Sequence, residues 1–373
     1  MKEINTFISE SLELRKRNNS LRTLKSENSL IDFCSNDYLG FSQSKELKLC
    51  FENELKKYPE YRLGSGGSRL LAGNHSFTEN LEKEIALFHE SESSILYNSG
   101  YDANNGLFAC LPQRGDTIIS DELIHASIID GIRLSHASRY VFRHNDLSSL
   151  EQKLKLAKGR IFIAVESVYS MDGDEAPLKE IARLSKQYNA ALIVDEAHAV
   201  GIFGEKGRGL IHELGLCHEV LARTITFGKA LGTHGAAILG SRQLRDYLIN
   251  FSRAFIFTTA TPFLSHLSVQ SAYLFLKSRD HQSDIHKRIL FFKQNISSKV
   301  NLLSSRSAIQ IIVIPGNNKA RETAEIIQQR GFDVRAILSP SVAEGSERLR
   351  ICIHNHNTIV EIKNLCESLN HSL

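Results

Sequence analysis

Residues 190–198 read AALIVDEAH, an apolar run that stops at Asp195. An unbroken aliphatic run of this length is typical of a strand buried on both faces, as in parallel sheets covered by helices. The carboxyl ends of such strands open into the crevice where ligands bind. A carboxylate is costly to bury there unless a cation or several donors meet it. Asp195 is therefore a candidate ligand-binding residue, although by itself it could simply cap the following turn.

Apolar runs alternate with amphipathic segments on both sides of this run. Strand-like runs occupy residues 93–97, 160–170 and 222–230, and helical patterns begin near Ser76, Asp146 and Pro177. This alternation predicts an α/β fold with a mainly parallel central sheet. From about residue 281 the order becomes strand, helix, strand, helix, which indicates a smaller α+β domain. We therefore expect an N-terminal arm (1–44), a large domain (45–280) and a C-terminal small domain (281–373).

Composition restricts the class of protein. Of 373 residues, 42% are hydrophobic and 23% charged, and the net charge is +3, so the sequence predicts a soluble globular protein with no nucleic-acid partner. No run approaches the roughly 18 apolar residues of a membrane helix, and the charged start differs from a signal peptide, so we expect a cytoplasmic protein. Six scattered cysteines favour reduced thiols, and His354 and His356 favour a solvated loop, so no metal site is expected.

A second strand-like run, TITFGKALG (224–232), ends beside Lys229. A lysine and an acid at the ends of neighbouring strands match the needs of pyridoxal 5'-phosphate (PLP), namely a Schiff-base amine and a partner that keeps the ring nitrogen protonated. Desolvation would lower the pKa of such a lysine and free its amine. The phosphate needs backbone N–H groups at a helix start, and Ser99, Gly100 and Tyr101 stand at one. His125 is a candidate for stacking on the ring, although a lone histidine is more often structural.

Motifs along nearly the whole chain resemble the α-oxoamine synthase family. They are SNDYLG (35–40), GSGGSRLLAG (64–73), NSGYDAN (98–104), DELIHASIIDG (121–131), SMDGDEAPL (170–178), VDEAHAVGIFGEKGRG (194–209), TFGKALGTHGAA (226–237) and ERLRI (347–351). The resemblance implies a PLP-dependent transferase of fold type I, similar to aspartate aminotransferase. It also implies a homodimer with shared active sites that condenses an amino acid with an acyl thioester.

The resemblance assigns roles to individual residues. Lys229 would bind PLP covalently, Asp195 would face the ring nitrogen and His125 would stack on the ring, with Lys229, His125, His198 and Asp195 as the catalytic set. The other expected cofactor contacts are Ser99, Gly100, Tyr101, Ser170, Thr226 and, reaching the partner subunit's phosphate, Thr258 and Thr259. Arg22, Asn36 and Arg350 would bind substrate, Arg350 as the cation for the amino acid's carboxylate. Strand alternation places Arg348 and Arg350 on one face, so only the motif favours Arg350.

The resemblance also bears on the substrates. TFGKALGTHGAA and SMDGDEAPL are closer to the members that join L-alanine to a pimeloyl thioester in biotin synthesis, carried by coenzyme A or a carrier protein. HASIIDGIRL leans toward the glycine-using 2-amino-3-ketobutyrate ligases, that is, glycine C-acetyltransferases, and a quorum-signal synthase fits most of the same motifs. Thr78 and Arg69 differ from the residues that relatives carry at these positions, so the resemblance does not define the acyl pocket or the amino-acid pocket. A plain aminotransferase would share Lys229 and Asp195, whereas a non-catalytic subunit would be expected to lack the lysine.

Overall fold

The computed structural model describes residues 1–17, 21–24 and 29–373, which fall into two units, Met1–Leu30 and Ile31–Leu373. The first unit contains one helix, α1 (Lys2–Arg17), with basic residues in its last turn. The second unit begins with β1 (Ile31–Asp32), which pairs in parallel with β10 (Phe332–Asp333). Tyr38 and Phe41 are buried in this second unit. The predicted arm boundary at residue 44 stays a prediction.

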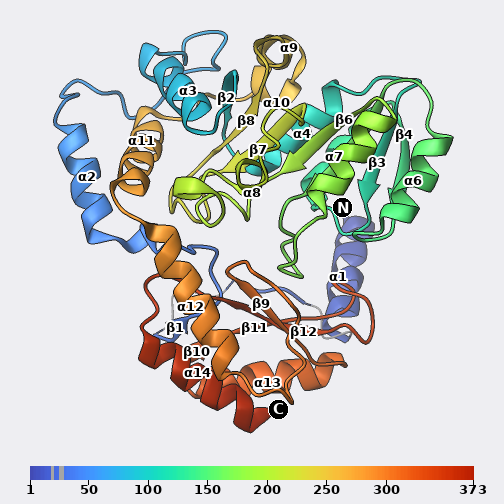
Figure 1. Ribbon diagram of the computed structural model, residues 1–373, viewed down its shortest axis with the longest axis vertical. Coiled ribbons are helices and arrows are strands. Elements are labelled where there is room, and N and C mark those ends of the chain that lie inside the picture. Colours follow the sequence, from blue (N-terminus) through green and yellow to red (C-terminus); the bar gives the residue numbers. More distant parts are fainter. Residues whose placement is uncertain (18–20, 25–28) are drawn as a thin grey trace. The chain divides into compact units, whose positions relative to one another are not determined.

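A seven-stranded sheet forms the centre of the second unit (Figure 1). Its strands lie in the order β2 (Ser93–Tyr97), β8 (Ala236–Gly240), β7 (Ala222–Thr226), β6 (Ala190–Asp195), β5 (Ile161–Glu166), β3 (Thr117–Asp121) and β4 (Ser138–Phe142). Only β8 runs antiparallel to its neighbours. The predicted α/β class with a mainly parallel central sheet is confirmed.

Helices cover both faces of this sheet because its strands are apolar on both sides. In β6, Ile193 packs with α4 (Gly100–Cys110), α5 (Ala126–Leu134) and α9 (Arg242–Phe251) in one buried cluster. Leu192 and Val194 point the other way and pack with α6 (Leu147–Leu156) and α7 (Leu178–Gln187). Each such aliphatic side chain contributes about 1.5–3 kcal/mol by leaving water. This burial on two faces fixes where the strands end, and hence the position of Asp195.

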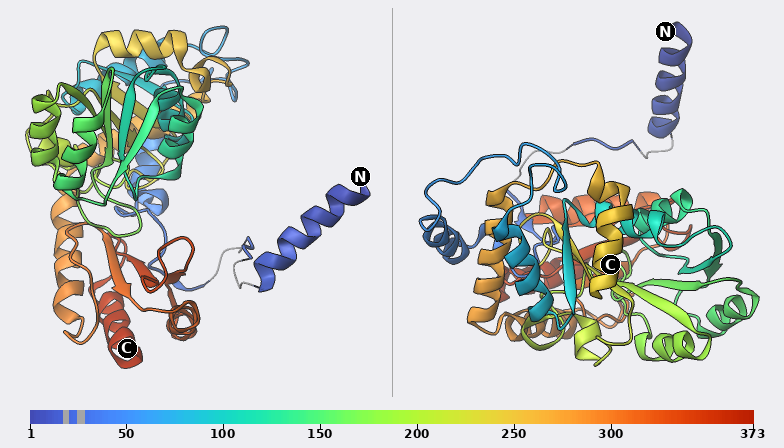
Figure 2. Two further views of the ribbon diagram at one scale, coloured as in Figure 1. Left: turned by 90° about the vertical axis from the view of Figure 1, so that its right-hand side faces the viewer. Right: turned by 90° about the horizontal axis from the view of Figure 1, so that it is seen from above.

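The small domain is built on a three-stranded antiparallel sheet in the order β11 (Arg335–Ile337), β12 (Arg348–Cys352) and β9 (Ile309–Val313). Figures 1 and 2 show α13 (Asn317–Gln329) and α14 (Ile359–Ser372) against this sheet, with α12 (His281–Asn295) beside them. A capping box of Thr358 and Glu361 starts α14. The predicted α+β character of this region is confirmed.

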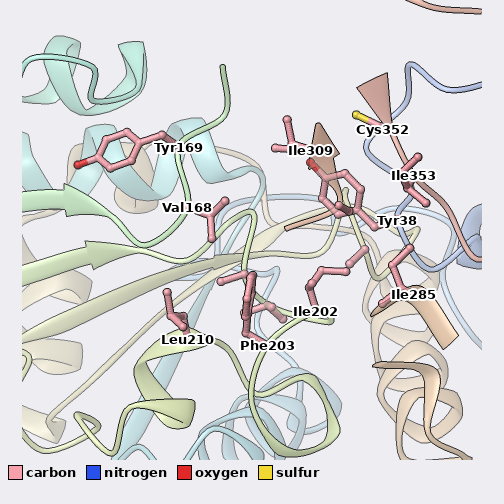
Figure 3. Packing of buried hydrophobic residues seen from close by; sticks show 14 of the residues in the cluster. Tyr38, Val168, Tyr169, Ile202, Phe203, Leu210, Ile285, Ile309, Cys352 and Ile353 are labelled. Carbon is pink, nitrogen blue, oxygen red and sulfur yellow. The ribbon is translucent and has the colours of Figure 1, made fainter. Parts of the chain in front are cut away.

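The remaining helices connect these layers. They are α2 (Lys45–Leu55), α3 (Ser76–Phe88), α8 (Leu210–Glu213), α10 (Arg253–Ile256), α11 (Phe263–Ser278) and the short 3-10 turns Phe41–Gln43 and Glu205–Gly207. Figure 3 shows that one apolar cluster joins the two sheets, with Tyr38, Ile202, Ile285 and Ile309 in close packing. Within the described part of the chain, no helix is both long and apolar enough to span a membrane.

Candidate active site

A cavity of about 250 Å³ opens where β5, β6 and β7 end. The lining residues are Ser99, Gly100, Tyr101, Asn104, His125, Ser127, Glu166, Asp195, Ala197, His198, Thr226, Gly228, Lys229, His234 and Gly235. Eight of the residues expected from the sequence therefore meet in one place. They come from four separate segments, because the carboxyl ends of parallel strands share one edge of the sheet.

One end of the cavity has the features of a phosphate site. Ser99 caps α4 by accepting a hydrogen bond from the Asp102 N–H, which leaves the first turn of the helix pointing into the cavity with its positive dipole end. Across from it, the Thr226 hydroxyl is buried and has no hydrogen-bond partner. A Cβ added to Gly100 would lie 2.5 Å from Thr226 Cγ2, so only glycine allows this close approach. An orphaned hydroxyl facing a helix start fits a bound phosphate.

We expect Gly100→Ala to weaken PLP binding about 10-fold. The added methyl group must displace Thr226 from the helix start, and overpacking of this kind costs about 1–3 kcal/mol. Fluorescence titration of the protein with PLP measures the change. Gly64→Ala is the matched control, because an added Cβ there meets nothing within 4 Å. Equal PLP affinity in the Gly100 variant would contradict the assignment of the phosphate site.

Asp195 and His125 are connected through two buried side chains. Asn104 Nδ2 donates to Asp195 Oδ2 (2.7 Å) and to Ser127 Oγ (3.0 Å), and Ser127 Oγ lies 2.8 Å from His125 Nδ1. The Ala197 N–H donates to the other Asp195 oxygen at 2.8 Å. Because the Ser127 oxygen accepts a hydrogen bond from Asn104, the Ser127 hydroxyl donates its own hydrogen bond to His125 Nδ1. The ring nitrogen Nε2 then carries the histidine's proton, and the orientation of the imidazole is fixed.

Glu166 lies beside Asp195 on the neighbouring strand and was not expected from the sequence. The two residues are paired in the β5–β6 register, and Glu166 Oε1 is buried without a hydrogen-bond partner. Burial, reinforced by repulsion from Asp195, raises the pKa of Glu166 well above its usual value. Two adjacent carboxyl groups cannot both ionise cheaply in one cavity, so Glu166 is the protonated member of the pair.

Lys229 begins a chain of hydrogen bonds that leads to Arg350. Lys229 Nζ lies 2.8 Å from His198 Nε2, and His198 Nδ1 lies 2.7 Å from the Tyr38 hydroxyl. Tyr38 donates to Asn36 Oδ1 (3.1 Å), which also accepts from Arg350 NH2 (2.9 Å). Asn36 and Arg350 thus stand behind the cavity and are coupled to it through Tyr38.

The direction of this chain fixes the state of His198. Asn36 Oδ1 can only accept a hydrogen bond, so the Tyr38 hydroxyl donates to it. Tyr38 must therefore accept the hydrogen bond from His198 Nδ1. Burial, with the nearby Lys229 and Arg350 cations, lowers the pKa of His198 well below its usual value, so the ring is neutral. Its Nε2 therefore accepts a hydrogen bond from Lys229. Burial also lowers the pKa of Lys229, against the opposing attraction of Asp195.

The structure distinguishes the two arginines of β12. Both are buried. Arg348 is paired with Asp172 at 2.5 Å and donates to two backbone carbonyls. Arg350 donates only to the Ser170 carbonyl, Asn36 and Cys352 Sγ, and it has no carboxylate partner among the described residues. A buried cation without an anion is suited to bind a substrate carboxylate.

Besides Asn36 and Arg350, four predicted residues lie outside the cavity lining. Ser170 contributes its backbone carbonyl to Arg350. Thr258 and Thr259 accept from Asn98 Nδ2 and line a different cavity, so their predicted contact with a partner subunit stays a prediction. Arg22 is exposed in the separate N-terminal unit, and its role stays a prediction as well.

The sequence interpretation missed several residues of the site, and some had a readable signal. Glu166 ends the apolar run IFIAVE just as Asp195 ends AALIVD, so the same argument applied to both. Tyr38 lies inside SNDYLG, two residues after Asn36. Asn104, Ser127 and His234 carry no such local mark, because helical position alone does not reveal which side chain faces a cavity.

The segment around His354 differs from the expected solvated loop, because His354 is fully buried. Potential ligand atoms of Asp32, His354 and His356 lie within 4.8 Å of one another. Both ring nitrogens of His354, however, are at 3.0 Å from oxygen atoms, of Ser35 and of Asn357. The bond to Ser35 joins the segment after β1 to the segment after β12, and the two bonds occupy both nitrogens that His354 could offer to a metal.

Comparison with known proteins agrees with this geometry. Residues 28–369 match the family described as aminotransferase class I and II. The chain is 41% identical to 8-amino-7-oxononanoate synthase from Emericella nidulans, in an alignment 365 positions long that covers 91% of this chain and 89% of the relative.

Two solved structures extend the likeness. 8-Amino-7-oxononanoate synthase from Francisella tularensis aligns with a TM-score of 0.77 and 29% identity, over 92% of this chain and 98% of that one. The serine palmitoyltransferase of Sphingomonas wittichii aligns with a TM-score of 0.88 and 25% identity, over 99% and 97% of the two chains.

Proposed function

The chain belongs to the class I and II aminotransferase family, among its α-oxoamine synthases, and we propose that it joins L-alanine to a pimeloyl thioester. The products are 8-amino-7-oxononanoate, carbon dioxide and the free thiol, a step of biotin synthesis. One observation carries the proposal. Lys229 and Asp195 share a cavity with a helix start suited to bind phosphate, and a chain of hydrogen bonds leads from Lys229 to Arg350, which has no carboxylate partner among the described residues. The 41% identity to an 8-amino-7-oxononanoate synthase supports the choice of substrates.

PLP is the cofactor of this family, and the cavity residues fit it. Its phosphate suits the α4 start and the Thr226 hydroxyl, its ring nitrogen suits Asp195, and its aldehyde suits Lys229. When bound, PLP withdraws electrons from the alpha carbon of an amino acid, provided that its ring nitrogen is protonated. We propose that Asp195 holds that proton in place and that His125, fixed through Ser127, covers the ring.

The remaining work falls to the residues of the hydrogen-bonded chain. Arg350 binds the carboxylate of alanine, and Asn36 orients the guanidinium from behind. Lys229 Nζ removes the alpha proton, and burial, which lowers the pKa of Lys229, favours the neutral amine that this step needs. The new carbon–carbon bond forms as the thioester's carbon–sulfur bond breaks, and the carboxylate is then lost. His198 Nε2 can donate to a developing oxyanion only after it has taken a proton, since its single N–H points to Tyr38.

We further propose a cytoplasmic homodimer. The family resemblance supports Thr258 and Thr259 as contacts to the partner's phosphate site, Ser170 as a neighbour of the PLP phenolic oxygen, and Arg22 as a contact to the acyl chain. Exposure of Thr259 and Arg22 is compatible with these roles.

Thiol release by the PLP-loaded protein tests the proposed reaction. We expect release with L-alanine and a pimeloyl thioester, offered in parallel on coenzyme A and on a carrier protein, and none with glycine and acetyl-CoA. Mass spectrometry should identify 8-amino-7-oxononanoate as the product. Release only with glycine and acetyl-CoA would move the protein to the glycine-using members. Amino-group exchange with a keto acid, without an acyl thioester, would reveal an aminotransferase instead.

A further inference from the structure

His144 bridges two loops of the active site from outside the cavity. It follows β4 in the stretch RHND (143–146), and its Nδ1 lies 3.0 Å from Asp121 Oδ1 while its Nε2 lies 2.8 Å from Asp174 Oδ2. The imidazole also packs edge to face on Tyr169, with ring centroids 4.5 Å apart. Asn145 adds to the bridge, since its N–H donates to Asp121 Oδ2 and its side chain donates to Asp174 Oδ2.

Two carboxylates can both bond this ring only if both of its nitrogens donate, so His144 is an imidazolium. Burial opposes the charge, but hydrogen bonds and attraction from Asp121 and Asp174 outweigh it and raise the pKa of His144 to about 10. The other groups around His144 are Glu122, whose carboxylate accepts the His144 backbone N–H, and the uncharged Tyr169. None of these neighbours is a cation.

Each bonded aspartate lies in a loop that leads to the active site. Asp121 Oδ1 also accepts the Leu123 N–H, which sets the turn that leads to His125. The Asp174 carbonyl accepts the Tyr169 N–H, which closes the loop that contains Ser170. The Ser170 carbonyl in turn holds Arg350 Nε at 2.8 Å.

From this connectivity we propose that His144 is a positioning residue for catalysis. It ties the loop that carries His125 to the loop that holds Arg350, and so fixes the ring-covering imidazole relative to the carboxylate-binding guanidinium. His144 touches neither cofactor nor substrate. The inference rests on the roles proposed above for PLP, His125 and Arg350.

His144→Gln in the PLP-loaded protein tests this inference. A glutamine amide can donate to one carboxylate but cannot reach both, so only the contacts of Asn145 still tie the two loops together. We expect alanine to bind about 10-fold more weakly, because small misplacements of binding groups cost that much or more. Spectral titration of bound PLP with alanine gives the affinity, and the pH midpoint of the PLP absorbance should also shift. His212→Gln is the control, since His212 likewise faces a carboxylate, Glu90 at 3.3 Å, but is remote from the cavity lining.

The thermal stability of the two proteins gives a second readout. The raised pKa means that the stabilisation by His144 is fully present below its ordinary value of 6.5 and is lost as the pH rises through about 10. The difference in unfolding temperature between the wild type and His144→Gln should therefore be largest at pH 6 and shrink toward pH 10. If His144→Gln fails to fold, Asp174→Asn, which weakens one end of the bridge, should weaken alanine binding in the same direction.

A lower unfolding temperature with unchanged alanine affinity and an unchanged PLP spectrum would overturn the inference and leave His144 a purely structural residue. A wild-type protein that binds no PLP or no alanine would instead refute the proposed function. Because the wild type is measured first, the two failures are distinguishable.

Discussion

Replacing Lys229 with alanine is expected to lower turnover by at least about 10⁴-fold while PLP still binds. One residue is proposed both to attach the cofactor and to remove the alpha proton, and a positioned base alone contributes about 10²–10⁴-fold. The phosphate contacts at Gly100 and Thr226 and the carboxylate of Asp195 remain in the variant. Noncovalent PLP binding should therefore survive.

Borohydride reduction followed by mass spectrometry separates attachment from binding. In the wild type, the peptide that contains Lys229 should gain the mass of reduced PLP, and the variant should show no modified peptide. Lys179→Ala is the control, because Lys179 is an exposed lysine of α7. Modification at a different lysine in the wild type would exclude Lys229 as the attachment residue.

The second large effect is expected at Asp195. Asp195→Asn keeps the side-chain shape but removes the negative charge that holds a proton on the PLP ring nitrogen, and we expect turnover to fall about 10³-fold. Glu166→Gln changes the neighbouring carboxyl group in the same way. Because burial and the charge of Asp195 raise the pKa of Glu166, its neutral amide replaces an already neutral acid. We expect this second variant to lose less than about 10-fold.

Steady-state turnover with alanine and a pimeloyl thioester, together with the PLP absorbance spectrum, measures both variants. The pair controls for substitution of a buried carboxyl group at this point of the sheet, since the two residues occupy paired positions in β5 and β6. A larger loss from Glu166→Gln than from Asp195→Asn would reverse the assignment, with Glu166 as the charged partner of the ring.

The positions of Asp195 and Lys229 could be predicted from the sequence because each follows an apolar run whose pattern is local. A strand buried on both faces must be apolar throughout, so a charged residue at its end stands out and the strand order delivers it to one edge. The helix start at Ser99 was readable for the same reason. Local patterning therefore predicted the fold class and the cofactor, and it pointed to the pair that we propose as catalytic.

Other features of the site depend on contacts between distant segments. Alternation places Arg348 and Arg350 on one face of β12, and only the structure shows that Asp172 pairs with Arg348 while no carboxylate of the described residues pairs with Arg350. The proton on His198 Nδ1 is fixed by Tyr38, and the charge on His144 by two carboxylates from separate loops. Sequence pattern determines which side chains are available and which elements carry them. The charge state of each side chain, and whether it still has room for a ligand, are set by its neighbours in space. Hydrogen bonds and Coulomb forces act over a few ångströms, however many residues separate the partners along the chain.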